Sequence, residues 1–244
     1  MAIHLSTDFG LEGPYTGQVL ARLYAEAPKI PAFSLFADAP AFDARLSAYL
    51  VAAYGKDAAA GDVLLCVVDP GVGTDRAGLA LNADGRWFVG PDNGLLDIAA
   101  RQAREARWWR LDGPPMEVSA TFHGRDWFAP AAAFVARTGE VPGVRCDGPS
   151  GVSAEWPADL PEIVYIDRYG NAMTGLRADG VAPECRFEVC GTRVDPGRVF
   201  ASAPAGAPLW YRNANGLVEI AVNRGRADRL PGLALGTRVT YAAI

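Results

Sequence analysis

Residues that could bind a ligand or do chemistry are concentrated in four short segments of the sequence. TDFG begins at residue 7, DPGVGTDR at 69, GPDNG at 90 and TFHGRD at 121. Asp8 and Asp69 each follow an apolar run that predicts a strand. Ligands of open α/β sheets bind beyond the carboxyl ends of the strands. The spacing therefore predicts a polar site for a small ligand at one edge of a sheet.

Each of these residues also has a structural explanation when it is considered alone. Asp8 is typical of a turn or helix cap, and Asp69, which precedes a proline, is typical of a turn. His123 suits a hydrogen-bonded core position, and a single arginine such as Arg76 usually lies on the surface. We interpret Asp92-Asn93-Gly94 as a turn that leads into a helix.

Several common catalytic motifs are incomplete in this chain. The glycine-rich loop 71–76 starts like a dinucleotide-binding fingerprint, but Arg76 replaces its last glycine. Gly55-Lys56 is followed by an aspartate, so there is no phosphate-binding P-loop. Residues 148–152 miss the last glycine of a nucleophile elbow. With two histidines and no Cys-x-x-Cys pair, we also expect no metal site.

The first part of the chain alternates between strand and helix patterns, which predicts an α/β domain with a largely parallel central sheet. The run VLLCVV at 63–68 is continuously apolar and predicts a strand that is buried on both faces. The other expected strands are 3–7, 32–37, 79–83 and 86–89, and the expected helices are 15–27, 43–54, 94–105 and 125–138.

The pattern changes after about residue 140. Residues 139–161 are rich in glycine and proline and aperiodic, which is typical of a linker. From residue 162 onward, short apolar segments alternate with turn residues and no helix is evident, which predicts a small all-β barrel or sandwich. We place an N-terminal α/β domain at 1–150 and a C-terminal β domain at 151–244.

Composition limits the classes of partner. The chain has 244 residues, half of them apolar and 21% charged, with a formal net charge of −5, so a basic face for nucleic acid is disfavoured. The apolar runs are too short to cross a bilayer, and the start lacks the features of a signal peptide. The four cysteines lack framework spacing and are expected to be reduced thiols. We expect a cytoplasmic protein.

Six segments in order resemble the S-adenosyl-L-methionine (SAM) hydroxide adenosyltransferase family, whose relatives include fluorinase and chlorinase. Besides the four segments above, they are IDRYGN at 166–171 and YRNANGLVEIAVNRGRA at 211–227. The resemblance implies an α/β domain followed by a β-barrel-like domain. It implies hydrolysis of SAM to adenosine and methionine by water or hydroxide attack at ribose C5′. It also implies no cofactor, because a sulfonium is already a good leaving group, and a homotrimer with sites shared between subunits.

The same resemblance places the catalytic set on Asp69, Arg76 and His123. An imidazole titrates near neutral pH and can take a proton from water. A carboxylate can orient the imidazole or hold the water, and a guanidinium can stabilise developing hydroxide. The three residues are therefore expected to activate the water together, with the proton acceptor left open.

Substrate contacts follow from the resemblance as well. Asp8 matches a ligand of the ribose hydroxyls, which a carboxylate can bind by accepting two hydrogen bonds. Phe42 falls near an aromatic wall against the ribose, although core packing is an equal alternative. Asp167 matches a partner of the methionine ammonium group, and Asn171 matches a hydrogen-bonding position on the purine or methionine side.

Two loops of the C-terminal part complete the expected substrate site. The stretch 222–227, which includes Asn223 and Ala227, matches a loop whose backbone binds the adenine edge. The family pattern Asn-Ser-x-Gly is replaced at 213–216 by Asn-Ala-Asn-Gly. Ala214 lacks the hydroxyl that helps to hold the methionine carboxylate, and Asn215 or a backbone N–H group could substitute for it.

Two other functions are compatible with this scaffold. A halide-dependent adenosyl transferase is one, but the halide-using relatives carry tyrosines at the positions of Asp69 and His123 and a serine at that of Gly124. A carboxylate beside the nucleophile would repel halide anions. A SAM- or adenosine-binding protein without activity is the other, because a shared fold does not guarantee shared chemistry.

Overall fold

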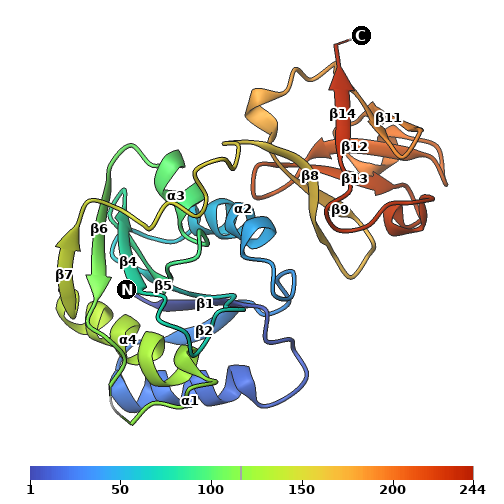
Figure 1. The fold of residues 1–244 in the computed structure, drawn as a ribbon. Helices are drawn as coiled ribbons and strands as arrows, with labels where there is room; N and C mark the ends of the chain where they lie inside the picture. Colours follow the sequence, from blue (N-terminus) through green and yellow to red (C-terminus); the bar gives the residue numbers. More distant parts are fainter. Residues whose placement is uncertain (116, 244) are drawn as a thin grey trace. The chain divides into compact units, whose positions relative to one another are not determined.

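A computed structural model describes residues 1–115 and 117–243 (Figure 1). The chain divides into two compact units, Met1–Trp156 and Pro157–Ile244. The sequence places the boundary after residue 150. The guanidinium of Arg101 donates hydrogen bonds to the carbonyl oxygens of Ser153 (2.6 Å) and Trp156 (2.7 Å), so the segment up to Trp156 belongs to the first unit.

The first unit is an α/β domain, as the sequence predicts. Its seven-stranded sheet has the order β2-β1-β3-β5-β4-β6-β7. The pairs from β2 to β5 are parallel, and the pairs β5–β4, β4–β6 and β6–β7 are antiparallel. The strands are β1 (Ile3–Thr7), β2 (Ala32–Phe36), β3 (Val63–Val67), β4 (Gly78–Ala83), β5 (Arg86–Pro91), β6 (Ala106–Leu111) and β7 (Gly143–Cys146).

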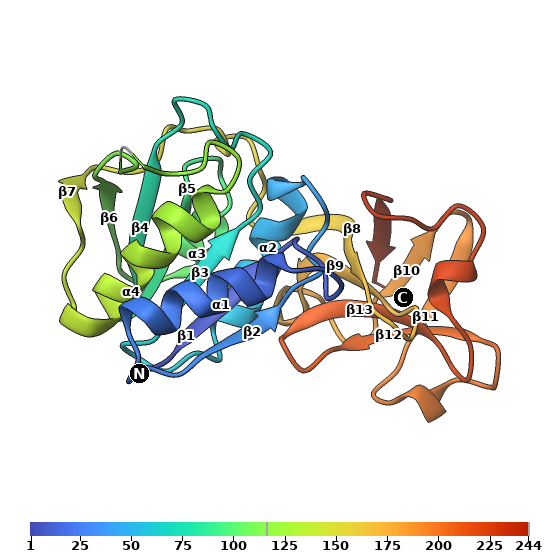
Figure 2. The ribbon, with the colours of Figure 1, turned by 90° about the horizontal axis from the view of Figure 1, so that it is seen from below.

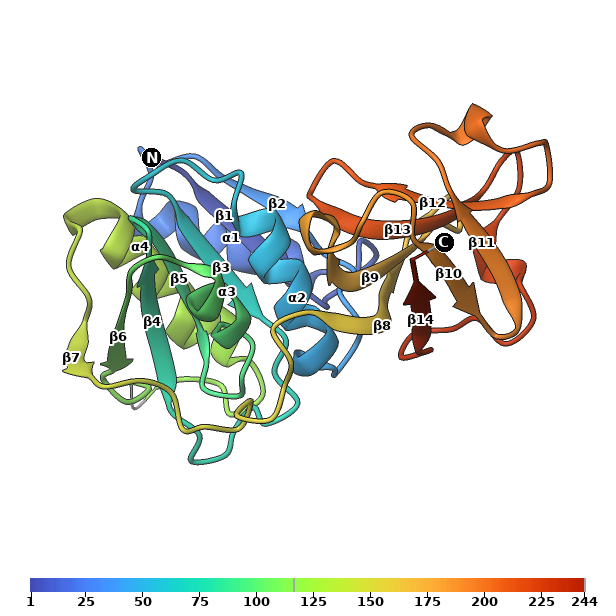
Figure 3. The same ribbon diagram turned by 90° about the horizontal axis from the view of Figure 1, so that it is seen from above.

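Helices cover both faces of this sheet. Helices α1 (Tyr15–Glu26) and α4 (Ala129–Thr138) lie together on one face (Figure 2), and α2 (Ala44–Gly55) and α3 (Asp97–Gln102) lie on the other (Figure 3). All five residues of β3 are buried, which confirms the expectation of a strand covered on both faces. Apolar side chains of α1 and α4 form one core cluster with β1 and β3.

Two parts of the first unit differ from the prediction. Helix α3 is shorter than the expected 94–105 because Gly94 has φ +90° and because the N–H groups of Arg104 and Glu105 bond the Asp84 carboxylate instead. The sequence pattern does not predict β6, and β7 lies within the expected linker 139–161. A Cβ atom at Gly143 would approach the Arg110 carbonyl oxygen to 2.1 Å, so glycine allows β7 to pair there.

The expected helix 125–138 begins with a π-helical turn, η1 (Gly124–Phe128), before α4 continues it. The N–H group of Ala129 bonds the carbonyl oxygen of Gly124, five residues earlier. Pro130 follows directly and has no N–H group to donate to the preceding turn. π-Helical turns of this kind are frequent at functional sites.

The second unit is an all-β, barrel-like domain, as the sequence predicts. Its seven-stranded sheet has the order β14-β10-β11-β12-β13-β9-β8. The two edges meet, because Ile163 of β8 exchanges backbone hydrogen bonds with Thr237 (2.9 Å) and Gly236 (2.8 Å) just before β14. The strands are β8 (Leu160–Ile166), β9 (Ala172–Arg177), β10 (Arg186–Val189), β11 (Thr192–Pro196), β12 (Pro208–Arg212), β13 (Leu217–Val222) and β14 (Val239–Ala242).

The short apolar segments EIVYID, RFEVC, PLWYR, LVEIAV and RVTYA of the sequence predict five of these strands, whereas β9 and β11 are missed. Gly175 interrupts β9 and Pro196 ends β11, and both residue types weaken a strand pattern. The described residues of this unit form three short 3₁₀ turns, η2 (Ala178–Gly180), η3 (Phe200–Ser202) and η4 (Ala227–Arg229), and no α-helix. Within the described parts of both units, no helix has the length and apolar character needed to cross a membrane.

The start of β1 is held by one carboxylate. Asp62 accepts hydrogen bonds from the N–H groups of Ala2 (2.8 Å) and Ala59 (3.1 Å), and its Oδ2 lies 3.0 Å from His4 Nε2. Burial of Asp62 opposes ionisation, but these partners outweigh it and lower the pKa of the carboxyl below 3.8. Because the folded-state pKa is the lower one, this stabilisation is present above about pH 4 and is lost as the pH falls further.

We therefore expect Asp62→Asn to lower the free energy of unfolding by about 1–3 kcal/mol at pH 7. The amide cannot accept all three hydrogen bonds as the carboxylate does. The difference between variant and wild type should shrink at pH 3, where the carboxyl of the unfolded wild-type chain is already mostly protonated. Urea unfolding at both pH values measures this, with the exposed Asp147→Asn as a control. An equal difference at the two pH values would contradict the assignment.

Candidate active site

A cleft of about 640 Å³ lies in the first unit, which is within the usual size of small-molecule sites. Four predicted site residues line it: Asp8, Phe42, Asp69 and His123. Asp8 directly follows β1, and Asp69 lies just beyond β3. The two strands are parallel neighbours, with Thr7 opposite Val67, so their carboxyl ends bring both aspartates to the same edge of the sheet. The structure thus brings these predicted residues together.

Asp69, Arg76 and His123 form one hydrogen-bonded cluster at the wall of the cleft. The guanidinium of Arg76 donates two hydrogen bonds to the Asp69 carboxylate, from Nε to Oδ1 (2.7 Å) and from Nη2 to Oδ2. Its Nη2 also lies 3.2 Å from His123 Nδ1. Asp69 and His123 line the cleft, whereas Arg76 lies behind them. Arg76 therefore holds the other two side chains at the cleft surface.

Aromatic rings enclose the guanidinium of Arg76. It lies 4.9 Å from the ring centroid of Phe128 and 5.6 Å from that of Trp127. Both rings belong to the π-helical turn η1, and His123 directly precedes that turn. The His123 ring also meets Trp127 edge-to-face, with centroids 5.5 Å apart. The π-helical turn therefore places His123 and two rings around one buried cation, where cation–π attraction is favourable.

Two glycines allow the close packing around this cluster. A Cβ atom at Gly90 of β5 would come within 2.3 Å of the Cys66 carbonyl oxygen, and one at Gly78 of β4 would come within 2.8 Å of the Trp127 ring. Because both positions lack a side chain, β5 can lie against the strand that leads to Asp69, and the π-helical turn can pack on β4.

The hydrogen bond from Arg76 fixes the protonation of His123. A guanidinium can only donate, so Nδ1 must accept and the neutral ring carries its proton on Nε2. Burial of the ring and the charge of Arg76 lower the pKa of His123 below 6.5, although Asp69 and Asp126 oppose this. His123 is therefore a neutral imidazole at pH 7, with Nε2–H as its donor.

Asp8 and Phe42, which also line the cleft, are joined by a hydrogen bond. Asp8 Oδ2 accepts a hydrogen bond from the N–H group of Phe42 (2.9 Å). Burial raises the pKa of the Asp8 carboxyl, and the nearby charge of Asp69 adds to the rise. Phe42 has φ +63°, in the left-handed region, and its side chain is 77% exposed. The sequence leaves core packing open as an alternative role for Phe42. Because the side chain is exposed, it does not pack into the core of this chain.

Asn93 supports the site although the sequence indicates only a turn there. Its Nδ2 donates to the carbonyl oxygen of Val68 (2.9 Å), the residue before Asp69, and its Oδ1 accepts from the N–H group of Leu95 (3.2 Å). Asn93 thus ties the turn before α3 to the strand end that leads to Asp69. Its place in GPDNG, between β5 and α3, is the only sequence signal for this role.

In the second unit, a cavity of about 380 Å³ is lined by Asp167 and Asn215, among others. Asn171 is buried beside it and fixes Asp167, because its N–H group and Nδ2 donate to Oδ1 (2.8 Å) and Oδ2 (2.9 Å) of that carboxylate. The turn between β8 and β9 therefore presents Asp167 in one orientation. Three predicted substrate residues lie together here.

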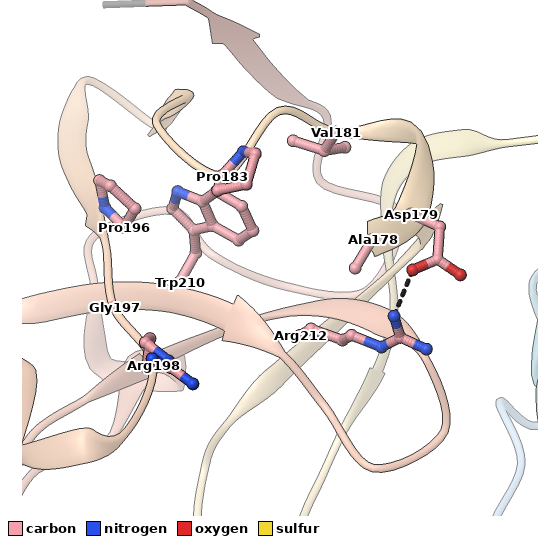
Figure 4. A pocket seen from close by; sticks show the side chains of 9 residues that line it. All are labelled: Ala178, Asp179, Val181, Pro183, Pro196, Gly197, Arg198, Trp210 and Arg212. Atoms are coloured by element: carbon pink, nitrogen blue, oxygen red, sulfur yellow. Dashed lines mark hydrogen bonds and ion pairs between the residues drawn. The ribbon is translucent and has the colours of Figure 1, made fainter.

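The other two predicted substrate residues line neither of these cavities. Asn223 donates from Nδ2 to the carbonyl oxygen of Ala203 (2.7 Å), and Ala227 is fully buried in the core of the barrel. A further cavity of about 560 Å³ in this unit contains none of the predicted site residues. Figure 4 shows the Trp210 ring in its wall and the ion pair between Arg212 and Asp179 at its rim.

Two family models of known proteins together match most of the chain. The family model of the SAM hydroxide adenosyltransferase N-terminal domain matches residues 3–144, and that of the C-terminal domain matches residues 161–240. The chain belongs to the SAM hydroxide adenosyltransferase family. This membership confirms the resemblance stated from the sequence.

Members of the SAM hydroxide adenosyltransferase family are similar to the chain over nearly its full length. An "(R)-S-adenosyl-L-methionine hydrolase" from Thermus thermophilus is 40% identical, over 97% of this chain and 98% of the relative. A protein of the same name from Salinispora arenicola is 35% identical, over 99% of this chain and 97% of the relative.

Solved structures share the fold. That of an uncharacterised conserved protein from Thermotoga maritima has a TM-score of 0.86 at 25% identity, over 98% of this chain and all of the other. That of a conserved hypothetical protein from Thermus thermophilus has a TM-score of 0.77 at 38% identity, over 99% of each chain. In residues 1–115 and 117–243 of this family member, no group of three or more His, Cys, Asp or Glu side chains is placed to hold a metal ion.

The protonation of His123 can be measured directly, because the chain has only two histidines. We expect its imidazole to titrate below 6.5 and to carry the neutral-form proton on Nε2. Arg76→Gln should raise the pKa, because it removes the neighbouring positive charge and leaves Asp69 and Asp126 in place. Long-range ¹H–¹⁵N spectra over a pH series give both quantities.

A His4→Gln variant assigns the remaining imidazole signal to His123, and Arg22→Gln on the surface of α1 serves as the matched arginine control. A wild-type midpoint at or above 6.5, or the same midpoint in Arg76→Gln, would show that Arg76 does not control this ring.

Proposed function

We propose that the protein hydrolyses S-adenosyl-L-methionine to adenosine and L-methionine. The observation that carries the proposal is the cluster of Asp69, Arg76 and His123 at the wall of the cleft in the first unit. Membership of the SAM hydroxide adenosyltransferase family and the printed names of the relatives support it.

The reaction is a substitution at the ribose C5′ carbon. A water oxygen forms the new bond to C5′ as the bond from C5′ to the sulfonium sulfur breaks. The sulfur keeps the electron pair and leaves as the neutral thioether of methionine. One proton is released from the water. The leaving group needs no acid, so the protein must position the water, exclude competing solvent and accept that proton.

The hydrogen bonds of the cluster indicate which residue carries out each of these tasks. Nδ1 of His123 is occupied by Arg76, so Nε2–H can orient the water but cannot accept its proton. Each Asp69 oxygen accepts one hydrogen bond from Arg76 and retains a second lone pair. We assign the proton to Asp69. Arg76, from its place behind both side chains, holds them toward the water, and its positive charge favours the negative charge that develops on the water oxygen.

The predicted substrate contacts remain part of the proposal. Asp8 binds the ribose hydroxyls and Phe42 covers the sugar. Residues of the second unit bind the rest of the substrate: Asp167, Asn171 and Asn215, together with the backbone of the loop that includes Asn223 and Ala227. The proposal also keeps the homotrimer, the absence of a cofactor and the cytoplasmic location expected from the sequence. Light scattering of the purified protein should then give three times the mass of one chain.

The decisive experiment follows the oxygen atom. The protein is incubated with SAM, EDTA and H₂¹⁸O without halide, and the products are quantified by chromatography and mass spectrometry. We expect equal amounts of adenosine and methionine, with one ¹⁸O atom at the 5′ position of adenosine. Asp69→Asn should lower kcat by about 10²–10⁴, the usual contribution of a general base. Asp75→Asn, an exposed aspartate of the same loop, should leave kcat unchanged.

Other outcomes separate the alternatives. Product that forms only with added chloride or fluoride, as a 5′-halogenated nucleoside, would identify a halide-dependent transferase. Tight binding of SAM without any product would identify a binding protein. Full activity in Asp69→Asn, with thermal melting as the check on folding, would show that the proton goes elsewhere.

A further inference from the structure

The cavity of about 380 Å³ in the second unit, which Asp167 and Asn215 line, contains a buried carboxylate that the proposed function does not use. Glu219 lies on β13 and is only 4% exposed, yet it lines this cavity together with Asp167. Glutamate is almost never fully buried without partners, because removing its charge from water is costly. Its partners therefore indicate what it does.

Glu219 is held by two donors. The hydroxyl of Tyr211 donates to Oε1, and Asn213 Nδ2 donates to Oε2 (3.0 Å). Tyr211 and Glu219 are direct partners in the antiparallel register of β12 and β13, so the register itself creates this contact. Burial and the adjacent carboxylate raise the pKa of Tyr211, so its hydroxyl remains a donor at neutral pH.

Glu219 also fixes the direction of the Asn213 amide. Because Nδ2 faces the carboxylate, Oδ1 must face the turn at 213–216. There it accepts hydrogen bonds from the N–H groups of Asn215 (3.0 Å) and Leu217 (2.9 Å). An amide flipped by half a turn would present NH₂ to both N–H groups and lose these bonds. Through Asn213, Glu219 therefore sets the orientation of the turn that carries Ala214 and Asn215 into the cavity.

The charges around this cavity suit a zwitterion. Asp167 and Glu219 are its two acidic residues, and Arg198 and Arg212 are its two basic residues. Arg212 is also paired with Asp179, which does not line this cavity but lines the other cavity of the unit, the one drawn in Figure 4. An α-amino acid group carries one ammonium and one carboxylate, so it can pair with both kinds of side chain.

We propose that Glu219 is a positioning residue for the amino-acid end of the substrate. It holds Asn213, and thereby the 213–216 turn, in the orientation that this end requires, and its negative charge adds to that of Asp167 in attracting the α-ammonium group. This inference rests on the proposed function.

The main test is Glu219→Gln, which keeps the volume and removes the charge. The variant can still fold, because its Oε1 can accept from Asn213 while its Nε2 donates to the Tyr211 oxygen. We expect KM for SAM to rise about tenfold, as for loss of a hydrogen bond to a charged group, and kcat to change much less. Glu188→Gln, an exposed glutamate of β10, is the matched control and should leave KM unchanged.

Binding measurements distinguish positioning from general damage to the fold. By calorimetry, the affinity for L-methionine should fall by a similar factor in Glu219→Gln, whereas the affinity for adenosine should stay as in the wild type. A residue that only stabilises β12 and β13 would weaken neither ligand selectively. An unchanged KM, or an equal loss of affinity for both ligands, would overturn the inference.

A second variant tests the route through the turn. Asn213→Ala keeps the Glu219 charge but removes the link to Asn215, so it should also raise KM. Glu219→Met has a similar volume but cannot accept from Asn213, so it also breaks this route. If Glu219 acts through Asn213, the double variant Glu219→Met/Asn213→Ala should be less impaired than the product of the two single effects. If the two single effects on KM multiply instead, Glu219 does not act through Asn213. Absence of SAM hydrolysis in the wild type would refute the proposed function, and methionine binding would then decide the role of Glu219 by itself.

Discussion

The arrangement of the first unit depends on what surrounds the guanidinium of Arg76. This cation lies in a largely buried position, where a charge is tolerated only with an opposite charge and complete hydrogen bonding. Asp69 supplies the charge and His123 accepts a further hydrogen bond, while Trp127 and Phe128 cover the guanidinium. Replacing Asp69 would leave the charge of Arg76 unpaired, and replacing Arg76 would do the same to Asp69. The cluster is therefore cooperative, and its members cannot be assigned independent energies.

The parts of this architecture that depend on local pattern can be predicted from the sequence. The buried strand β3 and the helices α1, α2 and α4 follow from apolar periodicity, and the site residues at strand ends follow from the topology of α/β sheets. The edge strand β7 cannot be predicted in this way, because it depends on backbone pairing at Gly143, which leaves no apolar pattern. The π-helical turn is equally hidden, because Pro130, two residues after Phe128, is typical of an ordinary helix start.

Residues that act through other residues are the hardest to find from sequence. Asn93 looks like a turn residue because its effect passes through the carbonyl oxygen of Val68, and Glu219 looks like one polar residue in a buried strand. Neither effect is visible until the partners are known, since a hydrogen bond between distant segments leaves no spacing rule in the sequence. The grouping of Asp69, Arg76 and His123 comes from the family resemblance for the same reason.

The carboxylates of the two units illustrate one physical principle. Asp8, Asp69, Asp167 and Glu219 all accept hydrogen bonds from the protein, and each keeps capacity for further partners. What a carboxylate can do for a ligand is set by the lone pairs that the fold leaves open. Asp69 has Arg76 on both oxygens, which fixes its direction and leaves lone pairs for a water proton. Glu219 likewise accepts one hydrogen bond on each oxygen, from Tyr211 and from Asn213, and through Asn213 it also orients the turn at 213–216. The same side-chain chemistry thus suits the base that we propose in one unit and the positioning residue that we propose in the other.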